Sequence, residues 1–261
     1  MTIIQMRFCR LAAMIASAST GFSQTPAVTS VNAANDRAIV APDSIASAWG
    51  ANFSTSTTAG TLTDGSLPSS VGGVQLSLVD NSMANLTPTL YMVSPTQINY
   101  VVPANAALGA GTLTVQSMSG NAEGALLISN VSPGIFTFNG SGTGVPAAQV
   151  LTYKPDGQVT NSSPAQPGSS TFAPSPIPIG SNQVYIVLYG TGVRRHSLNP
   201  VFAAVKGISI PVAYAGPQSQ FPGLDQINIG PLPTSLAGAG TTDLIVTVDG
   251  VPANSVQLAF H

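Results

Sequence analysis

Charge is the property that this sequence has least of. Of its 261 residues, only seven are Lys or Arg and nine are Asp or Glu, which is 6% of the chain, whereas an average soluble domain is about 25% charged. Seven cations cannot neutralise the phosphates that a nucleic-acid binder contacts, so nucleic acid is excluded as a partner. A coiled coil or a charged disordered tail would require many more Glu and Lys residues. The 26 Gly and 21 Pro residues indicate instead a chain with many turns.

Metal ligands, cysteine and long apolar runs are scarce as well. The chain has two His, one Cys and one Glu. No His or Cys pair and no acidic cluster has the spacing of a metal site, so we predict neither a metal nor a cofactor. Cys9 lies in the expected signal peptide, which would leave a mature protein without disulfides. No apolar run reaches the roughly 18 residues of a membrane helix, so we predict no transmembrane segment.

The N-terminus has the order of features that is typical of a secretory signal. Arg7 and Arg10 precede the short apolar run 11–18, which ends in the small-x-small pattern Ala16-Ser17-Ala18. We therefore predict a cleaved signal peptide over residues 1–24 and a secreted or cell-surface protein. A buried N-terminal helix is the alternative interpretation.

Beyond residue 25 the chain consists of short apolar or β-branched runs separated by turn residues. Strands at a spacing of roughly 8–12 residues are typical of an all-β sandwich. Two sequences, Lys154-Pro155-Asp156-Gly157 and Asp249-Gly250, have the chemistry of tight hairpin turns. The expected strands are Ser44–Trp49, Val74–Val79, Gln97–Val102, Gly111–Gln116, Ala125–Ile128, Gln183–Tyr189, Ile208–Tyr214 and Leu244–Val248.

An internal repeat relates the two halves of the chain. Ser44–Gly50 and Val184–Gly190 both read as strands that end in an aromatic residue followed by Gly. Further on, Gln97-Ile98-Asn99 recurs as Gln226-Ile227-Asn228, and each copy is followed by a Gly-rich turn and a β-branched strand. The repeat favours two domains of one type.

The repeat sets the expected domain organisation. We predict two tandem immunoglobulin-like β-sandwiches, over residues 25–131 and 132–261, with the junction at Val131-Ser132-Pro133-Gly134. The segment Asn161–Ser181 contains five prolines, which disfavour a helix or a central strand. We expect it to be an ordered irregular loop, and a disordered, protease-sensitive loop is the alternative.

Several motifs carry a family resemblance. They are Val31–Ala34 and Ser94–Asn99 in the first half, and Ser132–Phe136, Val187–Arg194, Tyr214–Gln218 and Phe221–Asn228 in the second. Together they resemble the Solibacter-type uncharacterised C-terminal domain. The resemblance covers nearly the whole chain after the signal peptide, and it implies paired immunoglobulin-like sandwiches in an exported bacterial protein without an established activity. This sequence departs from the family at Ser169–Gly180, which looks like an insertion, and at Ala239, where members often have a charged residue.

The preferred functional hypothesis is a non-enzymatic protein for cell-surface or extracellular adhesion. Its ligand would be a polysaccharide or a surface protein, because a polar but nearly uncharged surface favours contacts through hydrogen bonds. An aromatic sugar platform of Tyr214, Phe221 and Tyr189 is one interpretation of these rings, and core and interdomain packing is the other, which we prefer. The candidate binding residues are Arg194, Arg195, Tyr214, Gln218 and Phe221.

The alternative function is a secreted hydrolase, of esterase or glycosidase type, with a site at the module junction. The sequence has no Gly-x-Ser-x-Gly elbow, and His196 and Asp225 are its only weak candidates for catalysis. Asp225 is better explained by hydrogen bonds to the loop amides of Phe221–Leu224, or by a structural ion pair with Arg194 or Arg195.

Four further residues are expected to be structural. Gln97 and Gln226 occupy equivalent points of the repeat, and we predict that each side-chain amide bonds the backbone of a neighbouring loop. Trp49 and Tyr189 end equivalent strands. We expect Trp49 in the core of the first sandwich and Tyr189 in core or interdomain packing.

Overall fold

The computed structural model describes residues 27–166, 172–198 and 201–261. The expected signal peptide over residues 1–24, with Cys9, lies outside the described residues. Within the described part of the chain, no helix is long and apolar enough to cross a membrane.

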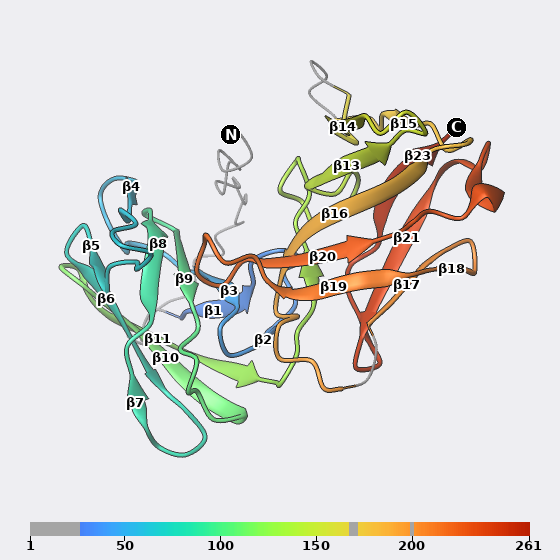
Figure 1. Ribbon diagram of the computed structural model, residues 1–261. Coiled ribbons are helices and arrows are strands. Elements are labelled where there is room, and N and C mark those ends of the chain that lie inside the picture. Colours follow the sequence, from blue (N-terminus) through green and yellow to red (C-terminus); the bar gives the residue numbers. More distant parts are fainter. Residues whose placement is uncertain (1–26, 167–171, 199–200) are drawn as a thin grey trace, which may run out of the picture.

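The first half of the chain forms two facing sheets (Figure 1). A five-stranded sheet has the order β1-β3-β9-β8-β4, and a six-stranded sheet has the order β2-β11-β10-β6-β5 with β7 beside β6. Their bounds are β1 (Thr29–Asn32), β2 (Ile39–Val40), β3 (Ile45–Trp49), β4 (Thr58–Ala59), β5 (Ser70–Val71), β6 (Val74–Val79), β7 (Asn85–Leu86), β8 (Thr89–Val93), β9 (Gln97–Val101), β10 (Gly109–Ser117) and β11 (Gly120–Ile128).

The second half repeats this arrangement. One six-stranded sheet has the order β14-β13-β16-β20-β19 with β12 beside β16, and the other has the order β15-β23-β21-β17-β18 with β22 beside β21. Their bounds are β12 (Gly134–Ile135), β13 (Ala148–Tyr153), β14 (Val159–Ser162), β15 (Pro176–Ile177), β16 (Gln183–Thr191), β17 (Phe202–Val205), β18 (Ile208–Ile210), β19 (Val212–Pro217), β20 (Asp225–Ile229), η1 (Thr234–Leu236), β21 (Gly240–Val248), β22 (Val251–Pro252) and β23 (Val256–Phe260).

Each half encloses its own core, because alternate residues of a strand point to opposite faces of a sheet. In the first half the buried cluster includes Leu76, Leu78, Ile98, Tyr100 and Leu113. In the second it includes Ile186, Leu188, Ile227, Leu244 and Leu258. Each half is therefore an immunoglobulin-like β-sandwich, and the predicted all-β fold of two such units is confirmed.

The sequence repeat corresponds to one register in both sandwiches. Trp49 of β3 lies opposite Gln97 of β9, just as Tyr189 of β16 lies opposite Gln226 of β20. The antiparallel pairing keeps the same register further along the strands; for example, Ser47 of β3 lies opposite Asn99 of β9. The repeated aromatic and amide residues are thus cross-strand neighbours in each unit.

The predicted hairpin turns are confirmed, and one predicted strand is wrong. The turn at Gly157, with φ +84°, joins β13 to β14, and the turn at Asp249-Gly250 joins β21 to β22 with positive φ at both residues. The expected strand Ile208–Tyr214 is instead two strands in two different sheets. Pro211 separates them, since proline has no N–H to donate to a ladder, and the chain changes sheets there.

Trp49 is not in the core of the first sandwich, contrary to expectation. On β3 the core positions are taken by Ala46 and Ala48, so Trp49 projects from the opposite face and is half-buried. β3 has apolar residues on both of its faces, so the sequence does not show which face is buried. For that reason the large Trp49 side chain was wrongly expected in the core.

The two sandwiches contact each other through a small apolar cluster and several hydrogen bonds. Ile45 of the first sandwich packs with Phe136 and Ala147 of the second, and the backbone N–H of Ile45 donates to Thr191 Oγ1 at 2.7 Å. The hydroxyl of Tyr91 donates to the carbonyl of Pro222, also at 2.7 Å. These contacts join the five-stranded sheet of the first sandwich to the end of the second.

Candidate functional site

The candidate binding residue Arg194 is engaged inside the second sandwich. Its Nε lies 2.7 Å from Asp225 Oδ1, and its Nη2 donates to the carbonyl of Leu224 at 2.8 Å. Asp225 Oδ2 also accepts the backbone N–H groups of Val193 and Arg194. Burial raises the pKa of Asp225, while Arg194 and these N–H groups act in the opposite direction. The structural ion pair considered from the sequence is present, and it involves Arg194.

Arg195, the second candidate cation, reaches the first sandwich. Its Nη2 lies 3.3 Å from Asp43 Oδ2 and donates to the carbonyl of Ala104. The carbonyl of Arg195 in turn accepts from Asn130 Nδ2 at 2.7 Å. Arg195 thus contributes to the contact between the sandwiches.

The two hydrolase candidates are engaged with different partners. The ring nitrogens of His196 lie 2.7 Å from the carbonyl oxygen of Ser197 and 3.2 Å from that of Ala215, whereas Asp225 is held by Arg194. A catalytic base needs a neighbouring group that orients it toward a nucleophile. His196 and Asp225 are not brought together in that way.

Gln218 and Phe221 belong to the loop between β19 and β20. The backbone N–H of Gln218 donates to the carbonyl of Leu224 at 2.9 Å, and Leu224 N–H donates to the carbonyl of Phe221 at 3.2 Å. Because Tyr91 bonds Pro222 in the same loop, the loop lies against the first sandwich. Tyr214 is separate from it, on the open face of β19.

The predicted hydrogen-bond partners of the Gln97 and Gln226 side chains are wrong. Gln97 Nε2 donates to Asn99 Oδ1 at 2.9 Å, and Gln226 Nε2 donates to Asn228 Oδ1 at 2.8 Å. Residues two apart on a strand share a face, so the repeated Gln-x-Asn motif forms a side-chain pair on one face in both sandwiches. Each Gln amide thus donates to the Asn two residues further along its own strand rather than to the backbone of a loop.

This alternation creates an uncharged surface on the second sandwich. On β13, β16 and β20, one set of alternate residues lies in the core, and the other set faces away from it. The second set is joined by Tyr214 of β19 and Asn161 of β14, which pair with Asn228 and Leu151. We call this surface the tyrosine face, and it consists of Gln149, Leu151, Tyr153, Asn161, Tyr185, Val187, Tyr189, Tyr214, Gln226 and Asn228.

The rings of the tyrosine face are fixed by their neighbours. Tyr153 and Tyr185 pack edge to face with centroids 5.5 Å apart and an interplanar angle of 80°, a favoured aromatic arrangement. The Tyr214 hydroxyl donates to the carbonyl of Pro217 at 2.7 Å. A Cβ at Gly216 would lie 2.9 Å from that hydroxyl, so the glycine lets the Tyr214 ring lie across its own strand.

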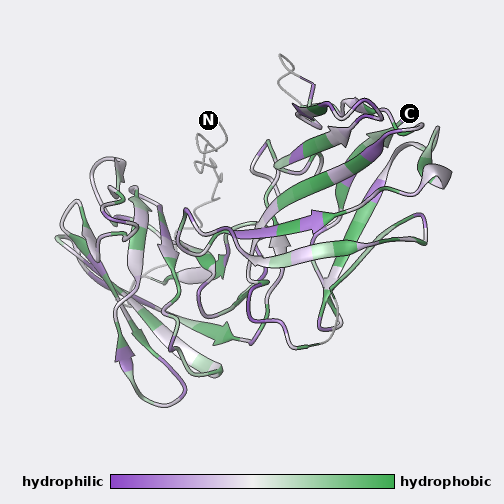
Figure 2. Ribbon diagram, viewed as in Figure 1, coloured by the Kyte–Doolittle hydropathy of each residue, from purple (hydrophilic) through white to green (hydrophobic). Residues whose placement is uncertain are grey.

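The tyrosine face is open and polar. Tyr153 is 43% exposed and Tyr214 is 41% exposed, whereas Tyr189, at the end nearest the first sandwich, is nearly buried, which raises its pKa. In Figure 2, β20 is largely hydrophilic beside the largely hydrophobic β16. The amide of Asn161 donates to Gln149 Oε1 at 3.2 Å. Exposed ring faces beside amides can stack on apolar surfaces of a ligand and bond its hydroxyl groups.

Sequence reasoning reached Tyr214, Tyr189 and Gln226 but missed most of this face. Tyr153, Tyr185, Gln149 and Asn161 were not singled out. The available signal was even spacing: Gln149 and Tyr153, and likewise Tyr185 and Tyr189, lie an even number of positions apart within one run. It indicates that such residues share a face within one strand, but it does not show which strands are neighbours.

Comparisons with known proteins give no family for this chain. No family model and no curated protein matches it. Among solved structures it is similar to SGBP-B of the Bacteroides ovatus mixed-linkage glucan utilization locus in complex with a mixed-linkage heptasaccharide, with TM-score 0.31, 11% identity, 86% of this chain covered and 43% of the other. SGBP-B from a complex xyloglucan utilization locus in Bacteroides uniformis has TM-score 0.24, 12% identity and coverages of 90% and 49%. The I9–I11 tandem of titin has TM-score 0.24, 9% identity and coverages of 85% and 62%. This chain therefore spans less than two thirds of each of these proteins.

Proposed function

We propose that this protein is an exported, non-enzymatic binding protein that holds a neutral polysaccharide on the tyrosine face. The observation that carries the proposal is the composition of that face. Partly exposed tyrosine rings and side-chain amides lie together on this face, and all residues of the face are uncharged. Export rests on the expected signal peptide over residues 1–24.

A neutral polysaccharide fits this surface for a physical reason. Each sugar ring has an apolar C–H face that packs on an aromatic ring and a rim of hydroxyl groups that donate and accept hydrogen bonds. The amides of Gln226, Asn228 and Gln149 supply both donors and acceptors beside the rings. An anionic or cationic polymer would find no counter-charge on the tyrosine face, so neutral glycans are favoured over charged ones.

The test is affinity electrophoresis of the mature protein in gels that contain one soluble neutral polysaccharide each, namely xyloglucan, mixed-linkage glucan, hydroxyethyl cellulose or dextran. We expect at least one polymer to retard the protein. The double variant Tyr153→Ala/Tyr214→Ala removes two exposed rings and should weaken binding roughly tenfold. Met118→Ala, at a fully exposed turn of the first sandwich, is the matched control and should bind normally.

A second variant tests whether binding depends on the position of the Tyr214 ring and not only on its presence. Gly216→Ala keeps Tyr214 but introduces a Cβ that would lie 2.9 Å from its hydroxyl, so the ring must move. It should weaken binding while the melting temperature stays near that of the unmodified protein. Retardation by none of the polymers, or equal retardation of the double variant and the control, would refute the proposal.

A further inference from the structure

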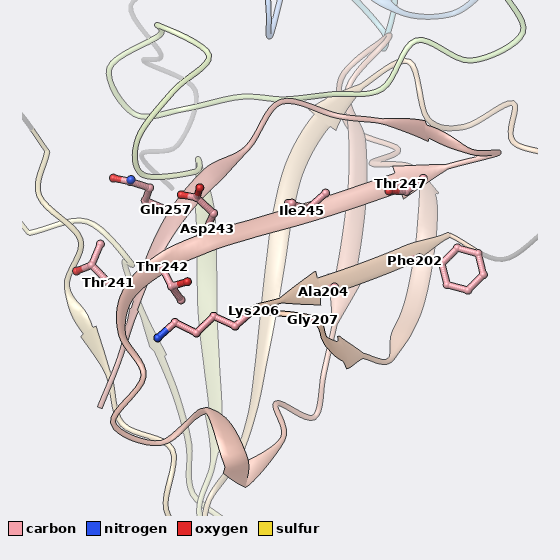
Figure 3. A pocket seen from close by; sticks show the side chains of 10 residues that line it. All are labelled: Phe202, Ala204, Lys206, Gly207, Thr241, Thr242, Asp243, Ile245, Thr247 and Gln257. Carbon is pink, nitrogen blue, oxygen red and sulfur yellow. The ribbon is translucent and has the colours of Figure 1, made fainter.

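The other sheet of the second sandwich, with the order β15-β23-β21-β17-β18, carries a hollow. A depression of about 570 Å³ lies over β17, β21 and β23, on the side of the sheet that faces away from the core. Figure 3 shows Phe202 at one end, Ile245 in the middle, and Lys206, Asp243 and Gln257 toward the other end.

Strand alternation and one small residue create this hollow. On β17, Ala203 and Val205 are in the core, so Phe202 and Ala204 point outward. Ala204 lies opposite Ile245 of β21, and its methyl group leaves space between Phe202 and Lys206 along this side of β17. The hollow is therefore a consequence of the order of residue sizes on β17.

The depression has an apolar wall and a polar end. Phe202 is 58% exposed and Ile245 is 48% exposed, while Asp243 lies opposite Gln257 across β21 and β23. Lys206 Nζ donates to the carbonyl of Ala239 at 2.8 Å, which holds the ammonium group at the edge of the hollow. One ring face at one end, with amide and carboxylate groups at the other, is a suitable arrangement for a short run of sugar units.

Further hydroxyl groups lie on β21. Thr247 is opposite Phe202, and Thr241 and Thr242 line the polar end of the depression. Hydroxyl side chains both donate and accept hydrogen bonds, so Thr247 suits the rim of a sugar whose C–H face packs on Phe202.

The depression and the tyrosine face lie on opposite outer surfaces of the second sandwich. The core of the second sandwich lies between the two sheets, with β13, β16 and β20 in one sheet and β17, β21 and β23 in the other. A stretch of stiff polysaccharide that lies flat on one sheet is on the wrong side of the sandwich to reach the other. Two sites placed in this way would be filled by separate stretches of polymer.

We infer that the depression is a second glycan site, centred on Phe202, and that the second sandwich cross-links polysaccharide chains by holding one on each side. The inference rests on the proposed function for its ligand class, but it concerns a different sheet and different residues. It assigns the protein the role of a bridge between polymers of a surface or matrix, because each of the two faces would hold a separate stretch of polymer.

The test measures stoichiometry and cross-linking with a neutral polysaccharide that retards the protein. Isothermal titration with an oligosaccharide of that polymer should give two sites per chain, and a light-scattering assay with the long polymer should show aggregates. Phe202→Ala should reduce the stoichiometry to one and abolish aggregation, although the protein still binds the polymer. Tyr153→Ala/Tyr214→Ala should do the same from the other side, and Met118→Ala should change neither property.

The possible outcomes distinguish the two proposals. If Phe202→Ala leaves both the stoichiometry and the aggregation unchanged while the tyrosine variant weakens binding, the second site is refuted and the tyrosine face stands. If only Phe202→Ala weakens binding, the depression is a glycan site, the tyrosine face is refuted and cross-linking fails. Since both readouts use the whole mature chain, aggregation that persists with a stoichiometry of one would show self-association of the protein and would also refute the bridge.

Discussion

Gln97 Nε2 donates a hydrogen bond to Asn99 Oδ1 at 2.9 Å, and both side chains are buried in the first sandwich. Ser47 Oγ donates to the same oxygen, also at 2.9 Å. Gln97 Oε1 and Asn99 Nδ2, however, have no hydrogen-bond partner among the described residues. The repeat preserves the Gln-x-Asn pair in both sandwiches, but the first copy is sealed whereas the second, Gln226 with Asn228, is half-exposed.

Gln97→Leu is expected to leave the free energy of unfolding unchanged within about 1 kcal/mol, or to raise it. The substitution keeps much of the side-chain volume and removes a buried carbonyl oxygen without a partner, while Ser47 still satisfies Asn99 Oδ1. Replacing a poorly satisfied buried polar group by an apolar one is close to neutral. Urea denaturation checks this, and a loss above about 3 kcal/mol would contradict it.

The buried ion pair between Arg194 and Asp225 predicts a large effect. Arg194→Met should lower the free energy of unfolding by about 3–5 kcal/mol, because it leaves a buried carboxylate without its counter-charge. The matched control is Arg195→Met, whose partner Asp43 is partly exposed, and it should cost about 1 kcal/mol or less. Equal losses in the two variants, measured by urea denaturation at neutral pH, would refute the assignment of Arg194 as a structural clamp.

The same variant predicts a direction of pH dependence. Burial raises the pKa of Asp225 and Arg194 lowers it, so Arg194→Met should raise this pKa further. A carboxyl group whose pKa is higher in the folded than in the unfolded state binds its proton preferentially when folded, and stability then falls as pH rises between the two values. The deficit of Arg194→Met should therefore shrink as the pH is lowered toward about 4, and a deficit that grows on acidification would contradict this.

For Asp80 we predict a pH dependence of stability of the opposite sign. Its Oδ2 accepts the Ala107 N–H at 2.8 Å, and its Oδ1 accepts from Ser82 and Ala84. These donors, Ala107 first, lower the pKa of Asp80 below its ordinary value of 3.8. Its contribution to stability is therefore present above that value and is lost as pH falls through the lower pKa of the folded state.

Asp80→Asn tests this directly. The substituted side chain can keep one carbonyl oxygen for Ser82 and Ala84, but its NH₂ group cannot accept the Ala107 N–H. We expect the variant to be less stable than the unmodified protein at neutral pH and the difference to close as pH falls below about 3.8. Thermal melting from pH 7 to pH 2.5 measures it, and a difference that is independent of pH would contradict the prediction.

The interface between the sandwiches is tested at Gly223. This residue has φ +76°, and a Cβ there would lie 2.8 Å from Ile45 Cγ1. Gly250 has nearly the same φ, +78°, but a Cβ there would meet no atom within 4 Å. Both Ala variants carry the backbone strain of about 1–2 kcal/mol, and Gly223→Ala should cost about 1–3 kcal/mol more, through overpacking of the interface. Differential scanning calorimetry compares the two variants. Equal melting temperatures would show that the interface accommodates the added methyl group without loss of stability.

The fold class, the hairpin turns and most of the strands could be predicted from the sequence. These features depend on local physical chemistry: alternation of apolar residues, the positive φ that glycine permits, and the N–H that proline lacks. Val74–Val79 was expected and found with the same bounds as β6. The internal repeat was visible for the same reason, since equivalent strands require equivalent patterns.

Which residues come into contact could not be predicted, because it depends on how distant strands pair. The side to which Trp49 projects, the division of Ile208–Tyr214 between two sheets, and the partners of Gln97 and Arg194 all depend on pairing between distant strands. The tyrosine face is assembled from five strands, and the hollow beside Phe202 exists because Ala204 lies opposite Ile245. Alternation assigns a residue to one side of its own strand, whereas register and sheet order, which are set by the packing of the whole core, decide what lies beside it.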